Sequence, residues 1–97
     1  MTITKNQNGN IVTLYIEGRL DTVTSVDLEK EINALSDADQ LVIDFEKLEY
    51  ISSAGLRVLL AAHKAYSEKK GLSILNVSET VMDVFDVTGF RDILNLN

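Results

Sequence analysis

The sequence of 97 residues contains no cysteine, proline or tryptophan, and it has one histidine. The absence of cysteine excludes disulfides, thiolate metal sites and a catalytic cysteine, and the single imidazole excludes any site that needs two. No apolar run approaches the roughly 18 residues of a membrane span, and the first residues have no signal-peptide core. We therefore expect a cytoplasmic protein that does not enter a membrane.

Basic residues are also scarce. The chain has 9 Lys and Arg and 15 Asp and Glu, which give a net charge of −6. Binding to nucleic acid or to an anionic membrane surface needs clustered cations, so neither is an expected partner. Hydrophobic residues make up 45% of the chain and charged residues 25%, which is typical of globular proteins. The length suits one domain, and no linker or repeat interrupts it, so we expect a single domain over residues 1–97.

Short apolar segments rich in β-branched residues predict strands. They lie at residues 3–6, 11–16, 41–45, 72–75 and 93–96. Asn8-Gly9 separates the first two and predicts an antiparallel hairpin, since both residues tolerate a positive φ. We expect Gly18 to end the second strand. The segment 41–45 is nearly all apolar, which is typical of a strand buried on both faces.

Three further segments carry apolar residues at helical spacing. They cover about 25–35, about 54–69, and the stretch between Ser78 and Gly89. Thr24 or Ser25 is expected to cap the first, and Thr24 with Asp27 resembles a capping box. Strands that alternate with helices favour parallel pairing. We predict an α/β fold: a mixed four- to five-stranded sheet with an N-terminal β-hairpin, and three helices covering its apolar surface.

Two isolated polar residues are weak candidates for chemistry. Asp44 is expected near the carboxyl end of a strand, where open α/β sheets place ligands, but the strand before it ends in Glu17-Gly18 without the acidic pair that a Mg²⁺ site would need. His63 falls on the apolar side of the second helix, with no second His or Cys to share a metal. Structural roles are favoured for both residues.

The stretch from Ser52 to Leu56, Ser-Ser-Ala-Gly-Leu, is the most informative. It opens a strongly apolar helix, whose first turn offers free N–H groups and positive partial charge. Small residues there leave room for another molecule, and a phosphate on one of these serines would meet the same N–H groups. An ordinary serine N-cap also explains the stretch, and these residues alone favour it. For Asp21, likewise, spacing favours a loop residue that binds nearby N–H groups.

Three motifs together resemble the STAS domains, specifically the bacterial anti-sigma factor antagonists. The segment 44–56 resembles the apolar strand, short loop and Asp-Ser-Ser-Gly-Leu helix start of that family. Residues 18–21, Gly-Arg-Leu-Asp, resemble its Gly-x-Leu-Asp turn, and residues 81–90 resemble its third helix and the turn that follows. The resemblance spans nearly the whole chain in the same order of elements.

The resemblance implies a switchable binding module rather than an enzyme. In the family, the unphosphorylated domain binds an anti-sigma factor, often a serine kinase, and so frees a sigma factor. The kinase phosphorylates the serine at the helix start and the complex separates; a phosphatase restores the domain. ATP and Mg²⁺ belong to the kinase, so no cofactor is expected in this chain, and we expect a monomer when it is free.

Alignment on Gly55-Leu56 puts Ser53 on the phosphorylated serine, Ser52 on the family's aspartate and Ala54 on its second serine. Ser53 is therefore the expected phosphorylation site, with Ser52 as the fallback. The expected partner-binding residues are Asp21, Thr22, Ser52, Ala54, Gly55, Leu56 and Arg57. The alternative is a STAS domain that serves, without phosphorylation, as a regulatory subunit of a transport or stress-signalling complex.

Overall fold

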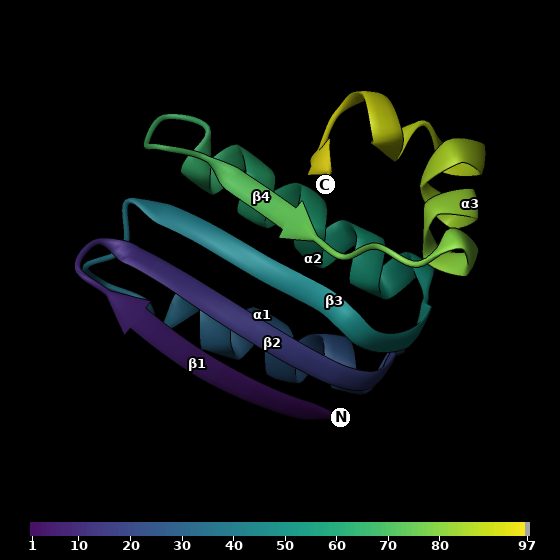
Figure 1. The fold of residues 1–97 in the computed structure, drawn as a ribbon, viewed down its shortest axis with the longest axis horizontal. Coiled ribbons are helices and arrows are strands. Elements are labelled where there is room, and N and C mark those ends of the chain that lie inside the picture. Colours follow the sequence, from purple (N-terminus) through teal and green to yellow (C-terminus); the bar gives the residue numbers. More distant parts are fainter. Residues whose placement is uncertain (97) are drawn as a thin grey trace.

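The computed structural model, which describes residues 1–96, has five strands in one sheet, in the order β1-β2-β3-β4-β5 (Figure 1). The strands are β1 Thr2–Asn8, β2 Ile11–Leu20, β3 Gln40–Ile51, β4 Leu72–Leu75 and β5 Asn95–Leu96. The helices are α1 Thr24–Asn33, α2 Ser53–Tyr66 and α3 Glu79–Thr88, and a 3₁₀ turn covers Phe90–Asp92. β1 pairs with β2 antiparallel, and every other pair is parallel. The predicted α/β fold with a mixed sheet and an N-terminal hairpin is confirmed.

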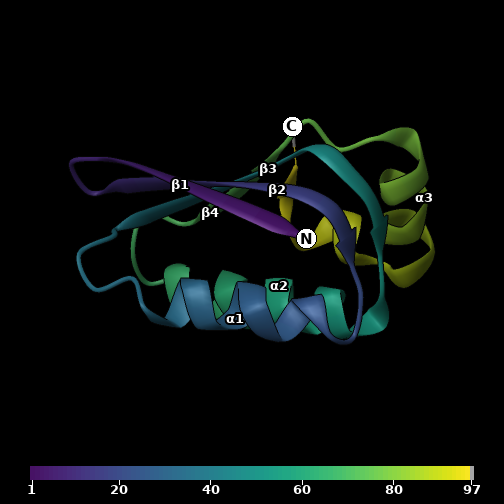
Figure 2. The ribbon, with the colours of Figure 1, turned by 90° about the horizontal axis from the view of Figure 1, so that it is seen from below.

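Helices α1 and α2 lie side by side on one face of the sheet (Figure 2). Alternate residues of the central strands point into the layer between sheet and helices, as the period of two in a strand requires. The fully buried side chains of this layer include Leu14 and Ile16 of β2, Ile43 of β3, Leu28 of α1 and Leu59 of α2. The opposite face of the sheet carries no helix in these views (Figures 1 and 2).

Helix α3 also covers part of the core, through Val81 and Phe85, but it does not lie on the same face as α1 and α2 (Figure 2). It lies beyond the carboxyl end of β4 (Figures 1 and 2), and it packs against β3 through Phe85 and Phe45. Both rings are fully buried, and their centroids are 6.4 Å apart. Ser78 caps α3 by accepting the N–H of Val81, and Gly89 ends it at a φ of 79°.

Several element boundaries differ from the sequence expectation. The hairpin turn is Gly9-Asn10 rather than Asn8-Gly9, because Asn8 pairs with Ile11. β2 does not end at Gly18; it continues to Leu20 through a register irregularity after that glycine, whose φ is 109°. β3 runs to Ile51, six residues further than expected. The extensions of both central strands remain part of the core, through Leu20 of β2 and Leu48 and Ile51 of β3, and their ends carry the loops described below.

Among residues 1–96, no helix combines the length and the apolar character that a bilayer crossing requires.

Candidate functional site

Two helix N-termini meet at one edge of the sheet. β2 and β3 run parallel, and Leu20 pairs with Ile51 where both strands end. The N–H of Ser52 donates a hydrogen bond of 2.8 Å to the carbonyl of Leu20, which joins the two loops that follow. The structure thus brings Asp21, after β2, and Ser53, at the start of α2, to the same edge, as the parallel pairing predicted.

The two serines at the start of α2 have different roles. Ser52 is the N-cap, with an extended backbone (φ −98°, ψ 173°), and its hydroxyl accepts a hydrogen bond of 3.3 Å from the N–H of Gly55. Ser53 is the first residue of the helix, and its side chain is exposed. The ordinary cap favoured by the sequence therefore exists, but Ser52 provides it. The hydroxyl of Ser53 is not needed for the cap and faces solvent.

Gly55 is glycine because the helix lies directly on the ends of two strands. A Cβ atom at this position would lie 2.9 Å from Cγ1 of Ile51 and 2.9 Å from both Cγ and Cδ2 of Leu20. The residue is buried, and the side chain of Leu56 beside it is also buried in the core. Both residues hold the helix in place, and their assignment as partner-binding residues stays a prediction.

Asp21 closes the first turn of α1. Its Oδ1 accepts hydrogen bonds from the N–H groups of Val23 (3.0 Å) and Thr24 (2.9 Å), while its own N–H donates to the hydroxyl of Thr24. The carbonyl of Asp21 accepts from both the N–H and the hydroxyl of Ser25. The loop role favoured by the sequence is confirmed, and the capping box of Thr24 and Asp27 is wrong, because the Thr24 hydroxyl points back to Asp21 and to the carbonyl of Arg19.

The hydrogen bonds of this turn also fix the charge of Asp21. The backbone N–H and the hydroxyl of Thr24, followed by the N–H of Val23, favour the ionised carboxylate and lower its pKa below the ordinary value of 3.8. The positive charge of Arg19 acts in the same direction. A fixed negative charge therefore stands at the edge that also carries Ser53.

A groove of about 380 Å³ runs between the first turns of α1 and α2. Its lining consists of Thr22, Ser25, Val26, Glu29, Ala54, Arg57 and Val58. Val26, which lines the groove, is 48% exposed, and Val23 nearby in the sequence is 75% exposed. Exposed apolar side chains with a polar rim are typical of a surface that binds another protein. Of the predicted partner residues, Thr22, Ala54 and Arg57 lie on this groove.

The other four residues that line the groove are not among the predicted partner residues: Ser25, Val26, Glu29 and Val58. The helical spacing identifies the apolar face of α1 that packs on the core. Val26 is an apolar residue outside that face, and this is the one signal in the sequence that pointed to the groove. The groove itself depends on how closely the two helices pack side by side on the sheet. A local sequence pattern does not predict this distance.

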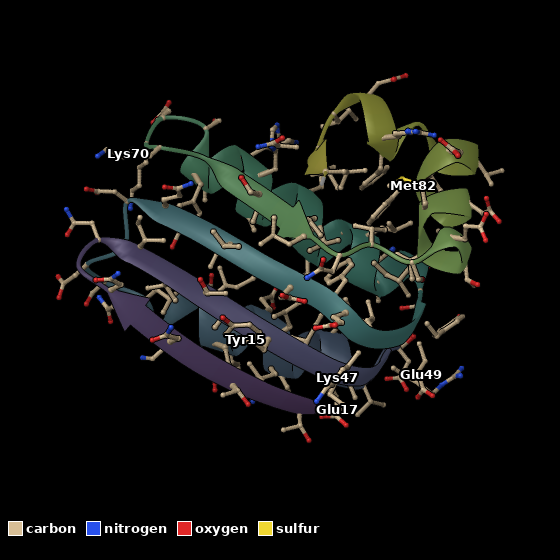
Figure 3. All side chains as sticks on the ribbon, viewed as in Figure 1. Tyr15, Glu17, Lys47, Glu49, Lys70 and Met82 are labelled. Atoms are coloured by element: carbon tan, nitrogen blue, oxygen red, sulfur yellow. The ribbon has the colours of Figure 1, made fainter. Side chains whose placement is uncertain are left out.

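Asp44 and His63, the two weak candidates, lie away from this edge. Asp44 lies within β3, not near its end, and its carboxylate accepts hydrogen bonds from the N–H of Glu46 (2.8 Å) and from the Asn76 amide (3.0 Å). It contributes to a hollow of about 300 Å³ on the open face of the sheet, near Tyr15, Glu17 and Lys47 (Figure 3). Residues 1–96 contain no cluster of three His, Cys, Asp or Glu side chains placed to hold a metal ion. His63 is half-buried on α2.

Comparison with known proteins gives a consistent picture. The family model described as "STAS domain" matches residues 2–97. A candidate anti-sigma factor antagonist of Bordetella bronchiseptica, BtrV, is 31% identical over 96% of this chain and 83% of its own length. A crystal structure of an anti-sigma factor antagonist from Mycobacterium paratuberculosis superposes with a TM-score of 0.88 at 24% identity, covering 98% of this chain and 83% of the other. The Bacillus protein SpoIIAA in its phosphorylated form gives 0.77 at 19% identity, over 99% and 91%.

Proposed function

Because the chain belongs to the STAS domain family, we propose that it is an anti-sigma factor antagonist whose partner binding is switched by phosphorylation of Ser53. The unmodified domain binds an anti-sigma factor through the edge that carries Asp21 and Ser53 and through the groove between α1 and α2. Phosphorylation releases the partner, a phosphatase reverses the change, and the chain itself has no catalytic role. The observation that carries this proposal is the exposed hydroxyl of Ser53 beside a cap that Ser52 already provides.

The position of Ser53 suits a reversible phosphate. The N–H groups in the first turn of a helix have no acceptor within the helix, and the positive end of the helix dipole favours an anion. A phosphoserine with about −1.5 to −2 charges at pH 7 can therefore be accommodated by the free domain without unfolding α2. The cap of Ser52 on Gly55 remains intact because it does not use the Ser53 hydroxyl.

The same phosphate is unfavourable in a complex. A docked partner excludes water from the edge, and the fixed carboxylate of Asp21 stands there as well. Disrupting a buried polar contact at an interface typically costs about 2–5 kcal/mol. At about 1.4 kcal/mol per tenfold change, this weakens binding by roughly 30- to 3,000-fold. That change is large enough to switch a complex while the domain stays folded.

The phosphoryl donor is supplied by the partner. The partner is proposed to be a serine kinase that holds ATP and Mg²⁺. The Ser53 oxygen attacks the γ-phosphorus, the bond to the bridging oxygen breaks, ADP leaves, and a base on the kinase takes the hydroxyl proton. This chain contributes only the hydroxyl, since its sequence has no Gly-rich phosphate loop.

The proposal is tested by phosphopeptide mapping of the protein purified from its own cells, together with binding measurements on the cognate anti-sigma factor. We expect phosphate on Ser53, constitutive binding by Ser53→Ala and poor binding by Ser53→Asp. Ser67→Ala is the matched control, because Ser67 is an exposed serine at the other end of the same helix. Phosphate on Ser52 would move the site by one residue. A chain that carries no phosphate under any growth condition would favour an unphosphorylated regulatory subunit instead.

A further inference from the structure

Arg57 lies one helical turn beyond Ser53 on α2, at the rim of the groove. Residues four apart on a helix lie on the same side, with Cβ atoms about 5–6 Å apart. Helical side chains lean toward the N-terminus, so a long side chain at position 57 covers the turn that contains position 53. Both side chains are exposed.

The guanidinium of Arg57 is uncommitted within the described part of the chain. The ion pair found among residues 1–96 joins Arg91 to Asp86, and the two cation–π contacts use Arg19 over Tyr50 and Lys69 over Tyr66. Of the seven residues that line the groove, Arg57 is the basic one and Glu29 the acidic one. A free cation therefore stands one turn from the exposed hydroxyl, on a chain with net charge −6.

We propose that Arg57 is the internal partner of the phosphate on Ser53. This inference rests on the proposed function, because it assumes that Ser53 is the modified residue. Guanidinium and phosphate form paired, charge-assisted hydrogen bonds, which are stronger than those between neutral groups. The phosphate of Ser53 draws Arg57 toward the N-terminus of α2 and away from Glu29 and the groove.

The pairing gives the switch a second component. In the unmodified domain, Arg57 and Glu29 offer opposite charges on the same groove to the docking partner. After phosphorylation, a dianion at Ser53 faces the partner. The partner can also no longer contact the Arg57 guanidinium, because the phosphate binds it. A change of charge on the first turn of α2 thus also changes the charge of the groove, because Arg57 moves out of it. Val26 and Val58 provide the apolar contact there.

The test measures the phosphate directly by ³¹P NMR. Phosphoserine is installed at position 53 during translation, so that no kinase is needed, and the second ionisation of the phosphate is titrated. In the native background Arg57 favours the dianion. Arg57→Gln should raise the phosphate pKa by about 0.3 unit or more, a twofold change in acid dissociation constant that matches an exposed ion pair within a helix. Arg57→Lys should retain most of the native value because it keeps the charge.

The other charged groups near the phosphate, Asp21 and Glu29, are unchanged in these variants. Lys64→Gln is the matched control: it removes an exposed cation from the same helix about 16 Å along the axis from Ser53. Equal phosphate pKa values with and without Arg57, or an equal shift in the Lys64 variant, would overturn the pairing. Because the phosphate is installed without a kinase, failure of phosphorylation in cells would count against the proposed function and leave this result standing. If phosphorylation releases the partner normally but Arg57 has no effect on the phosphate pKa, the proposed function stands and the pairing with Arg57 is wrong.

Discussion

The main-chain N–H of Ser52 donates a 2.8 Å hydrogen bond to the carbonyl of Leu20, which ties the cap of α2 to the last residue of β2. This bond continues the parallel pairing of β2 and β3 by one residue beyond Ile51. The loop with Asp21 and the helix start with Ser53 are consequently held by the sheet rather than by flexible segments. A change of charge at Ser53 therefore acts on a preformed surface.

The close packing beneath the site predicts that Gly55→Ala destabilises the fold. The added Cβ would lie 2.9 Å from side-chain atoms of Leu20 and Ile51. Overpacking costs about 1–3 kcal/mol, and the gain of about 1 kcal/mol in helix propensity offsets part of it. We expect a net loss of up to about 2 kcal/mol in the free energy of unfolding, measured by urea denaturation.

A double-mutant cycle with Leu20→Ala identifies the cause of that loss. Since Leu20 supplies two of the three close contacts, its truncation should cost less in the Gly55→Ala background than in the native chain. Simple additivity of the two changes would show that the clash is not with Leu20.

Substitutions of the two serines at the start of α2 should differ in their effect on the free energy of unfolding. Ser52→Ala removes the acceptor of the Gly55 N–H and is expected to lower the free energy of unfolding by about 1 kcal/mol. Ser53→Ala removes an exposed hydroxyl outside the cap and should stay within about 0.5 kcal/mol of the native chain. Ser52→Asp should retain the cap, because a carboxylate also accepts this bond and suits the helix dipole. A larger loss for Ser53→Ala than for Ser52→Ala would reverse the assignment.

Hydrophobic spacing predicted the order of elements and the helix starts well, because one face of each helix and strand packs on the core. The length of β3 could not be predicted in this way. β4 pairs only with residues 41–44 of β3, so the extension to Ile51 has β2 as its neighbour. In that extension Leu48 and Ile51 are buried and the residues between them are exposed, a spacing of three that does not resemble a strand.

The site was predicted in part for a similar reason. Short motifs located Asp21 and Ser53, and the parallel order of the strands brought them to one edge. The small residues at this helix start suggested open space, whereas at Gly55 that space is filled by Leu20 and Ile51. The groove at Val26 required the relative placement of α1 and α2, which depends on packing between segments distant in sequence.

The cap at Asp21 predicts a pH dependence of stability. Its folded-state pKa is lowered below 3.8, chiefly by hydrogen bonds from Thr24. The stabilisation is therefore fully present above about pH 4 and is lost as the pH falls through the lower folded-state pKa. Asp21→Asn should flatten the decrease in melting temperature below pH 4. Asp27→Asn removes an exposed carboxylate from the same helix, outside the cap, and should follow the native curve more closely; identical curves for all three proteins would contradict the assignment.

His63 is expected to have no part in partner binding. It is half-buried on α2, and ten helical residues separate it from Ser53 by about 15 Å along the axis. His63→Gln should leave the affinity for the cognate anti-sigma factor within about threefold, since such changes usually cost less than about 0.5 kcal/mol. Loss of binding at an unchanged melting temperature would place His63 on the functional surface.

The groove between α1 and α2 predicts where an added charge blocks the partner. Val26 lines the groove and is 48% exposed, so Val26→Lys can place its ammonium in water and leave the free domain folded. A docked partner would bury that charge without a matching group, and we expect binding to weaken by at least tenfold, or about 1.4 kcal/mol. The matched control is Val87→Lys on α3, where the valine is 85% exposed and lies outside the groove. The affinities of both variants for the anti-sigma factor are measured by calorimetry. Equal affinities would show that the partner does not enter the groove.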